Sequence, residues 1–206
     1  MDNDNSIHAV CVYCGSSVGN DLAFMNAGTE LGRALAEGQL KLIYGGGTTG
    51  LMGAVARGTL DVGGQVGAII PSFLINREAN QESLTLFEDL TITDTMHERK
   101  HQMFERSDAF VALPGGLGTV EEIVEIMTWG QLGQHCKPIV LLNINGFWNP
   151  LLALLNHLRD TGFIHSDHLL RLIVVERVED VVPAILAAES AAGVSSEGEP
   201  TIIEKL

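Results

Sequence analysis

The residues best suited to chemistry in this 206-residue chain surround a glycine-rich segment near its middle. Residues 114–119 read P-G-G-L-G-T and precede a predicted helix that carries Glu121, Glu122 and Glu125 in its first turns. Glycine lets a backbone approach a ligand closely, and the free N–H groups at a helix start favour an anion such as phosphate. A carboxylate aimed at that phosphate would repel it, so we expect at least one glutamate to face sugar hydroxyls or water.

A pair of cations, Arg99 and Lys100, begins the preceding predicted helix, beside the end of a neighbouring strand. Two cations and the carboxylates of Glu121 and Glu122 across one glycine-lined cleft suit a sugar phosphate. Acidic residues near a helix start also stabilise the helix through its dipole without any ligand. The combination with the glycines and cations favours a functional site.

Residues 97–101 read H-E-R-K-H, which matches the H-E-x-x-H pattern of zinc proteases. Such a site would use both histidines as ligands, Glu98 as base and a third ligand from elsewhere. The remaining histidines have no recognisable ligand spacing, and the segment falls between two strands of a parallel sheet. We therefore expect no metal here, and solvated histidines at a polar helix start.

Residues 45–50 read G-G-G-T-T-G and match the dinucleotide-binding pattern G-x-G-x-x-G. That pattern belongs after the first strand of a sheet, with an acidic residue about 20 positions later. Here it follows the second strand, and the later region reads A-I-I-P at 68–71. This disfavours a nicotinamide or flavin cofactor and leaves a tight turn or another ligand. No G-K-[ST] occurs, which excludes a P-loop nucleotidase.

Cys11 and Cys14 match the redox pattern C-x-x-C, but they lie within or just past a buried strand. There the two side chains face opposite sides of the sheet, whereas a redox pair would stand at a helix start. We expect two core thiols. No lysine stands in a context recognisable for a pyridoxal Schiff base.

The elements that position these residues alternate short apolar runs with longer amphipathic ones, as in βαβ units. Continuous apolar strands of this kind suit a parallel sheet buried on both faces. We therefore predict an α/β fold with a doubly wound, mostly parallel sheet flanked by helices on both faces. The predicted strands are 9–13, 41–44, 65–70, 90–93, 109–113, 139–142 and 172–175. The predicted helices are 22–37, 51–61, 97–106, 120–132, 150–160 and 179–189.

Three glycine clusters follow three of these strands, at residues 15–17, 45–50 and 114–119. Ligands of open α/β sheets bind where the strands end at their carboxyl edge. The clusters therefore predict one binding cleft at that edge. Residues 72–86 lack periodicity and are expected to be a surface loop.

Composition indicates a globular chain, with 46% hydrophobic and 18% charged residues. We expect one domain over residues 1–192 and a tail over 193–206, disordered or docked on a neighbour. The net charge of −14 disfavours binding to nucleic acid or anionic membranes. No apolar run has the length of a transmembrane helix, and the acidic first residues do not form a signal peptide. With three cysteines and no disulfide framework, a cytoplasmic location is expected.

Several segments resemble the LOG (lonely guy) family of cytokinin riboside 5′-monophosphate phosphoribohydrolases, which have often been labelled lysine decarboxylases. Residues 114–122 resemble its P-G-G-x-G-T-x-x-E signature, and residues 96–100 resemble its M-H-x-R-K segment. Segments 12–17, 44–53 and 128–133 also fit, so the resemblance covers about residues 8–187. His101 departs from the pattern, where a small residue is usual, and creates the zinc-protease coincidence.

The resemblance implies a Rossmann-like homodimer that hydrolyses the N-glycosidic bond of nucleoside 5′-monophosphates, including N6-modified adenosine monophosphates. The products would be a free base and ribose 5-phosphate, and no metal or organic cofactor would be needed. By the same resemblance Arg99 and Glu122 would be the catalytic pair, with Glu121 at the ribose. The 5′-phosphate would be held by Gly115, Gly116, Gly118 and Thr119. Further substrate contacts are expected from Gly15, Ser16, Gly46, Gly47, Met96 and Lys100.

Two alternatives stay open at this point. Molybdenum cofactor carriers resemble this fold and its P-G-G-x-G-T loop but bind without catalysis. A general AMP nucleosidase without a hormone role would share the mechanism. The pairing of Glu121 and Glu122 with Arg99 and Lys100 favours an enzyme over a carrier.

Overall fold

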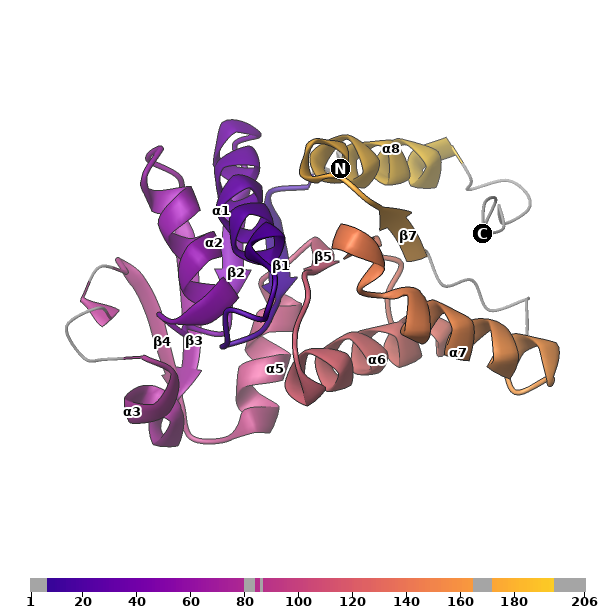
Figure 1. Cartoon of the computed structure of the whole chain (residues 1–206), viewed down its shortest axis with the longest axis horizontal. Coiled ribbons are helices and arrows are strands. Elements are labelled where there is room, and N and C mark those ends of the chain that lie inside the picture. Colours follow the sequence, from indigo (N-terminus) through magenta and orange to yellow (C-terminus); the bar gives the residue numbers. More distant parts are fainter. Residues whose placement is uncertain (1–6, 80–83, 86, 165–171, 195–206) are drawn as a thin grey trace, which may run out of the picture.

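The apolar runs of the sequence form a seven-stranded parallel sheet in the computed structural model, which describes residues 7–79, 84–85, 87–164 and 172–194 (Figure 1). The strand order is β4-β3-β2-β1-β5-β6-β7, and every pairing is parallel. The strands are β1 (Ala9–Tyr13), β2 (Lys41–Tyr44), β3 (Val66–Pro71), β4 (Asp89–Thr93), β5 (Ala109–Ala112), β6 (Ile139–Leu142) and β7 (Leu172–Val175). The Rossmann-like α/β fold predicted from the sequence is confirmed.

Helices cover both faces of the sheet (Figure 1). The α-helices are α1 (Leu22–Glu37), α2 (Gly50–Leu60), α3 (Ile75–Glu78), α5 (Met96–Glu105), α6 (Leu117–Gln131), α7 (Asn149–Asp160) and α8 (Val181–Val194). Short 3₁₀ turns are η1 (Ser72–Leu74), η2 (Ile144–Gly146) and η3 (Val178–Asp180). One apolar core lies between the sheet and α1, α2 and α8, and the other lies between the sheet and α5, α6 and α7.

Alternate side chains of β1 enter the two cores, as expected for an extended strand. Val12 and Cys14 belong to the core under α1, whereas Cys11 and Tyr13 belong to the core under α6. Both thiols are free and buried, and burial raises their pKa well above the ordinary value. The prediction of two core thiols on opposite faces is confirmed.

The chain reverses its direction of winding between β4 and β5. It builds outward from β1 to β4, crosses back through α5 and then builds outward on the other side of β1 from β5 to β7. The carboxyl ends of β1 and β5 therefore diverge into loops and helices on opposite faces, which opens a crevice between them. This switch point brings the glycine clusters after these two strands together.

A charged cluster ties β4 to its surroundings at the opposite, amino end of the sheet. The Asp89 carboxylate accepts a hydrogen bond from Lys41 Nζ at 2.6 Å and also pairs with Arg106. Partial burial acts to raise the pKa of Asp89, but the two cations outweigh it and lower that pKa. The cluster joins β2, β4 and the end of α5.

Two sequence predictions need correction, and two predicted segments lie partly outside the described residues. Helix α6 begins at Leu117 and not at 120. The sequence prediction started it too late because Gly116 and Gly118 have low helix propensity. The predicted loop 72–86 contains the helical turns η1 and α3, and its residues 80–83 and 86 lie outside the described residues. The expected tail from 193 lies outside them from residue 195 onward. Within the described part, no helix is both long and apolar enough to cross a membrane.

Candidate active site

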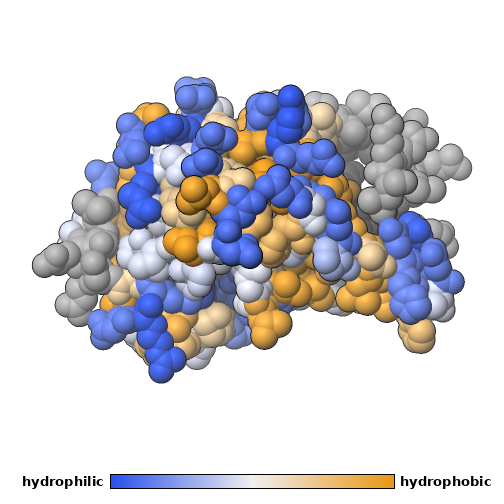
Figure 2. Space-filling model, in the orientation of Figure 1, coloured by the Kyte–Doolittle hydropathy of each residue, from blue (hydrophilic) through white to orange (hydrophobic). Residues whose placement is uncertain are grey.

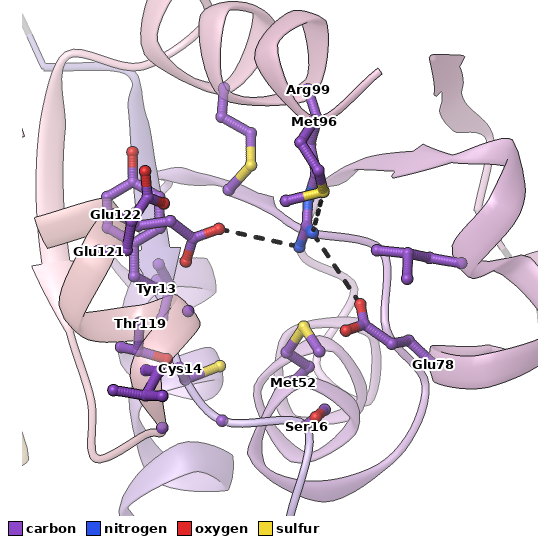
Figure 3. Close-up of a pocket in the computed structure, with 18 of the residues that line it drawn as sticks. Tyr13, Cys14, Ser16, Met52, Glu78, Met96, Arg99, Thr119, Glu121 and Glu122 are labelled. Carbon is purple, nitrogen blue, oxygen red and sulfur yellow. Dashed lines mark hydrogen bonds and ion pairs between the residues drawn. The ribbon is translucent and has the colours of Figure 1, made fainter. Parts of the chain in front are cut away.

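A cavity of about 440 Å³ occupies the crevice at the carboxyl ends of β1 and β5 (Figure 3). Its walls come from the loop after β1, the end of β2, α2, the η1–α3 segment, α5 and the start of α6. The lining residues are Val12, Tyr13, Cys14, Gly15, Ser16, Gly45, Met52, Phe73, Leu74, Glu78, Met96, Arg99, Met103, Gly116, Leu117, Gly118, Thr119, Glu121 and Glu122. Segments far apart in the sequence thus meet in one polar and apolar pocket.

The start of α5 is fixed by a capping box. Thr95 Oγ1 accepts a hydrogen bond from the Glu98 N–H at 3.1 Å, and the Glu98 carboxylate accepts from the Thr95 N–H at 3.3 Å. This reciprocal arrangement satisfies amide groups that a helix start leaves unpaired. The Glu98 carboxylate is therefore occupied by backbone N–H groups at the start of the helix. The H-E-x-x-H segment forms this helix start, and His97 and His101 are exposed. No cluster of three or more metal-ligating side chains occurs among the described residues.

Arg99, the fourth residue of α5, points into the cavity with only 7% of its side chain exposed. Its Nη1 atom lies 4.0 Å from Glu78 Oε2, and its Nη2 atom lies 4.0 Å from Glu122 Oε1 (Figure 3). Both separations exceed hydrogen-bond distance, so the guanidinium attracts two carboxylates without bonding to either. Its Nη1 atom donates a weak hydrogen bond to Met96 Sδ at 3.8 Å, and its Nε atom has no partner within the described residues. The Arg99 guanidinium thus lies between the carboxylates of Glu78 and Glu122.

Gly45 makes room for this guanidinium. A Cβ atom at position 45 would lie 2.8 Å from Arg99 Cζ and would overlap the Nη2 atom. Gly45 directly follows β2, so the end of that strand forms the floor on which the Arg99 side chain rests. A side chain at this position would displace the cation from its place between the carboxylates.

Glu122 stands in the second turn of α6 with 10% of its side chain exposed. Burial raises the pKa of this carboxyl to about 7, against the opposing effect of Arg99; Glu121 and Glu78 raise it further. A group with this pKa is present in both protonation states near neutral pH. It can therefore accept or donate a proton, which is the property required of a general acid or base.

The N-terminus of α6 opens into the same cavity. Gly116 caps the helix without any side-chain hydrogen bond, and helix geometry leaves the N–H groups of Leu117, Gly118 and Thr119 without intrahelical acceptors. Cβ atoms at Gly116 and Gly118 would meet nothing within 4 Å, so an anion can approach the backbone closely. Three converging amides at a helix start form a phosphate-sized anion site.

Lys100 lies on α5 beside Arg99 but faces α6 at the rim of the site. Its Nζ atom donates to Glu121 Oε1 at 2.5 Å and to Glu125 Oε1 at 3.0 Å. Partial burial acts to lower the pKa of Lys100, but these two carboxylates outweigh it and raise that pKa. Lys100 therefore offsets the charges of Glu121 and Glu125 at the rim, which reduces the repulsion that these carboxylates would exert on a phosphate.

Nine of the thirteen residues predicted for the site line the cavity: Gly15, Ser16, Met96, Arg99, Gly116, Gly118, Thr119, Glu121 and Glu122. The other four, Lys100, Gly115, Gly46 and Gly47, lie outside its lining. Gly115 supports the anion site from behind, because a Cβ atom there would overlap the Thr119 side chain. Contact of all thirteen with substrate stays a prediction.

Sequence reasoning missed several lining residues, of which Glu78 carries the most chemistry. It belongs to the aperiodic segment after β3, where no pattern marks it. Tyr13, Cys14 and Gly45 follow or end predicted strands, so their position at the carboxyl edge was a usable signal. Met52, Phe73, Leu74, Met103 and Leu117 form apolar parts of the wall.

The sequence comparisons agree on one family. A family model described as "Possible lysine decarboxylase" matches residues 52–185. The chain is 41% identical to the Arabidopsis thaliana cytokinin riboside 5′-monophosphate phosphoribohydrolase LOG1, over 89% of this chain and 88% of that protein. The chain belongs to the LOG family. A probable LOG-type phosphoribohydrolase from Oryza sativa, LOGL1, is 46% identical over 77% of this chain and 70% of that protein.

Solved structures extend the similarity beyond the LOG family at the level of the fold. A molybdenum cofactor binding protein from Rippkaea orientalis superposes with a TM-score of 0.63 at 19% identity, covering 88% of this chain and 97% of that one. The Chlamydomonas reinhardtii molybdenum cofactor carrier protein gives a TM-score of 0.67 at 19% identity, with coverage of 90% and 99%. At these identities the likeness shows a shared fold and nothing of the ligand.

Proposed function

We propose that the chain hydrolyses the N-glycosidic bond of adenosine 5′-monophosphates, including N6-modified ones, to a free base and ribose 5-phosphate. The observation that carries this proposal is the position of the buried Glu122 carboxyl, 4.0 Å from the Arg99 guanidinium and one helical turn from the free N–H groups at the start of α6. Burial raises the pKa of this carboxyl to about 7, which suits it to proton transfer. The LOG-family relatives, named as cytokinin riboside 5′-monophosphate phosphoribohydrolases, support the same reaction.

Cleavage of this bond builds positive charge on C1′ and the ring oxygen of the ribose. The Glu122 carboxylate at C1′ stabilises that charge and takes a proton from the attacking water. Water supplies the hydroxyl group that bonds to C1′ and the proton that ends on the base. Because water is the only co-reactant, the reaction requires no redox cofactor.

The substrate is oriented by its phosphate. The N–H groups of Leu117, Gly118 and Thr119 bind the 5′-phosphate at the start of α6, with Gly116 leaving room for it. Glu122 lies one turn further along the same rigid helix, so phosphate binding brings the ribose to the carboxylate. Binding energy at a group that does not react is thereby used to orient the bond that does.

Arg99 acts on the departing base and on Glu122 together. Its guanidinium donates hydrogen bonds to the base, which takes the bonding electron pair, and its charge keeps part of Glu122 ionised against the effect of burial. Glu121, held by Lys100, lies at the ribose hydroxyls, and Met96 packs against the substrate. Gly15 and Ser16 close the cavity from the β1 side, and the buried Gly46 and Gly47 support it from the β2 side.

The test is product analysis by chromatography after incubation with AMP, N6-prenylated AMP, adenosine and lysine. We expect free base and ribose 5-phosphate from the two monophosphates and no product from adenosine or lysine. Glu122→Gln and Arg99→Ala should each abolish base release, whereas the exposed control Glu88→Gln should match the wild type. Near wild-type turnover in either site variant would refute the assignment, and unchanged AMP would indicate a carrier. The ratio of kcat/KM values for the two monophosphates separates a cytokinin enzyme from a general AMP nucleosidase.

We further propose a homodimer in the cytoplasm. Figure 2 shows apolar residues gathered over α6 and the start of α7, and Leu117, Val124 and Leu154 are among the exposed hydrophobic side chains of these helices. An exposed apolar surface of this kind supports self-association. The cytoplasmic location is supported separately by the three free cysteines, which suit a reducing compartment. Sedimentation equilibrium should give twice the chain mass, and a monomer at micromolar concentration would contradict the dimer.

A further inference from the structure

Two polar atoms in the cavity wall lack hydrogen-bond partners within the described residues. They are Glu78 Oε2, an acceptor, and Arg99 Nε, a donor, and both are buried. The Glu78 carboxylate and the Arg99 guanidinium are 4.0 Å apart, so they attract each other without bonding directly. Buried polar groups without partners are few in native proteins, and a ligand that fills the gap accounts for them. Such a ligand presents a hydrogen-bond donor to Glu78 next to an acceptor for Arg99.

The three charged groups lie in a fixed order across the cavity. Glu122 faces Arg99 Nη2, and Glu78 faces Arg99 Nη1, so the cation stands between the carboxylates (Figure 3). One edge of an adenine nucleotide has the same order. C1′ is followed by N7, an acceptor, and then by the N6–H group, a donor.

We propose that Glu78 and Arg99 together read the Hoogsteen edge of adenine, Glu78 accepting the N6–H group and Arg99 donating to N7. This rests on the proposed function, which sets C1′ at Glu122. Arg99 then binds N7, which lies two bonds from the N9 atom of the breaking bond, and stabilises the electron pair that the base receives. Glu78 determines which base occupies that position.

The backbone around Glu78 is suited to this role. Its carbonyl oxygen accepts a hydrogen bond from the Thr48 N–H at 2.8 Å, which anchors α3 to the glycine-rich loop after β2. Phe73 and Leu74, in the turn before α3, line the same cavity and present apolar surface to the faces of a base. Acceptor and apolar wall thus come from one short segment.

Contacts of this kind with the adenine edge restrict which bases the cavity accepts. Adenine with one N6 substituent keeps an N–H group for Glu78, so N6-prenylated AMP is accepted. Hypoxanthine and guanine present the acceptor O6 at the same place, and its lone pairs face those of the Glu78 carboxylate. Adenine with two N6 substituents has no N–H group to donate. The predicted substrates are therefore 6-aminopurine nucleotides with at least one N6 hydrogen.

The test compares kcat/KM for AMP, IMP and N6,N6-dimethyl-AMP in the wild type, Glu78→Gln and the exposed control Glu88→Gln. The wild type and the control should prefer AMP to IMP by roughly 10- to 100-fold, the effect of leaving a buried acceptor unpaired. Glu78→Gln should lose most of that preference, because its amide group donates to O6. Glu78→Asp should lower kcat/KM but keep the preference, since it keeps the acceptor. Thermal melting of each variant shows whether it is folded.

An unchanged AMP-to-IMP ratio in folded Glu78→Gln would overturn the proposal, as would efficient wild-type cleavage of N6,N6-dimethyl-AMP. A Glu78→Gln effect confined to the ratio of AMP to 2′-deoxy-AMP would assign Glu78 to a ribose hydroxyl and overturn it as well. Calorimetric binding of AMP and IMP separates this proposal from the proposed function. Binding that prefers AMP through Glu78 in a chain without turnover would keep the adenine reading and refute the hydrolase.

Discussion

Replacing Glu122 by glutamine should stabilise the folded chain at alkaline pH while it removes activity. The carboxyl is buried, and burial raises its pKa from the ordinary 4.5 to about 7. Above that pKa the folded chain must hold a carboxylate in a position from which water is largely excluded. Glutamine has the same shape and carries no charge, so the variant avoids this cost.

The size of the effect follows from the pKa. A rise from 4.5 to about 7 corresponds to about 3 kcal/mol of stability lost once the group is ionised in both states. Between these two values the folded chain keeps a proton that the unfolded chain has released. The contribution of Glu122 to stability therefore falls as the pH rises through this window, with the full cost present above 7. At pH 5 the carboxyl is neutral in the folded chain and resembles glutamine.

Urea unfolding at pH 5 and pH 8 measures this difference. We expect Glu122→Gln to exceed the wild type by about 2 to 3 kcal/mol at pH 8 and to differ little at pH 5. The control Glu121→Gln alters the neighbouring, exposed glutamate and should change stability by less than about 1 kcal/mol at both pH values. A Glu122→Gln variant that is no more stable than the wild type at pH 8 would refute the reasoning.

Three further predictions concern activity and stability. Because Glu122 acts as a carboxylate with a pKa of about 7, kcat/KM for AMP should rise through a single ionisation near that pH and then level off; a flat profile from pH 5 to 9 would contradict this role. Gly45→Ala should lower turnover roughly 100-fold by displacing Arg99, with the melting temperature nearly unchanged; wild-type turnover would count against the placement of Arg99. Asp89→Asn should cost about 1 kcal/mol in urea unfolding by weakening the bonds to two cations, with no effect on kcat; a loss of activity at constant stability would disagree.

The fold was predictable because the five central strands of the sheet are almost wholly buried: β1, β2, β3, β5 and β6. Each of the predicted strands agrees with an observed one to within a residue at either end, and the helix over 22–37 agrees at both ends. Continuous apolar runs separated by glycine clusters leave few other arrangements. The first residue of α6 was harder to predict, because the glycines at the anion site have low helix propensity.

Some residues of the site were predicted from the sequence, such as Arg99 and Glu122, whereas Glu78 was not. The carboxyl-edge rule brought the glycine clusters and Glu122 to one edge of the sheet. Arg99 follows β4, which three strands separate from β5, so its approach to Glu122 also depends on the course of α5. Glu78 could not be predicted from the sequence. Its segment is anchored by a backbone hydrogen bond to Thr48, and no local sequence pattern encodes that bond. No local pattern showed that the Arg99 side chain would line the cavity while Lys100 would pair with Glu121 and Glu125.

The most direct test of the account is a crystal structure of Glu122→Gln with AMP bound. We predict the phosphate on the N–H groups of Leu117, Gly118 and Thr119, C1′ beside residue 122, and the Arg99 guanidinium at the base. A phosphate bound away from the start of α6, or a ribose turned away from residue 122, would contradict it.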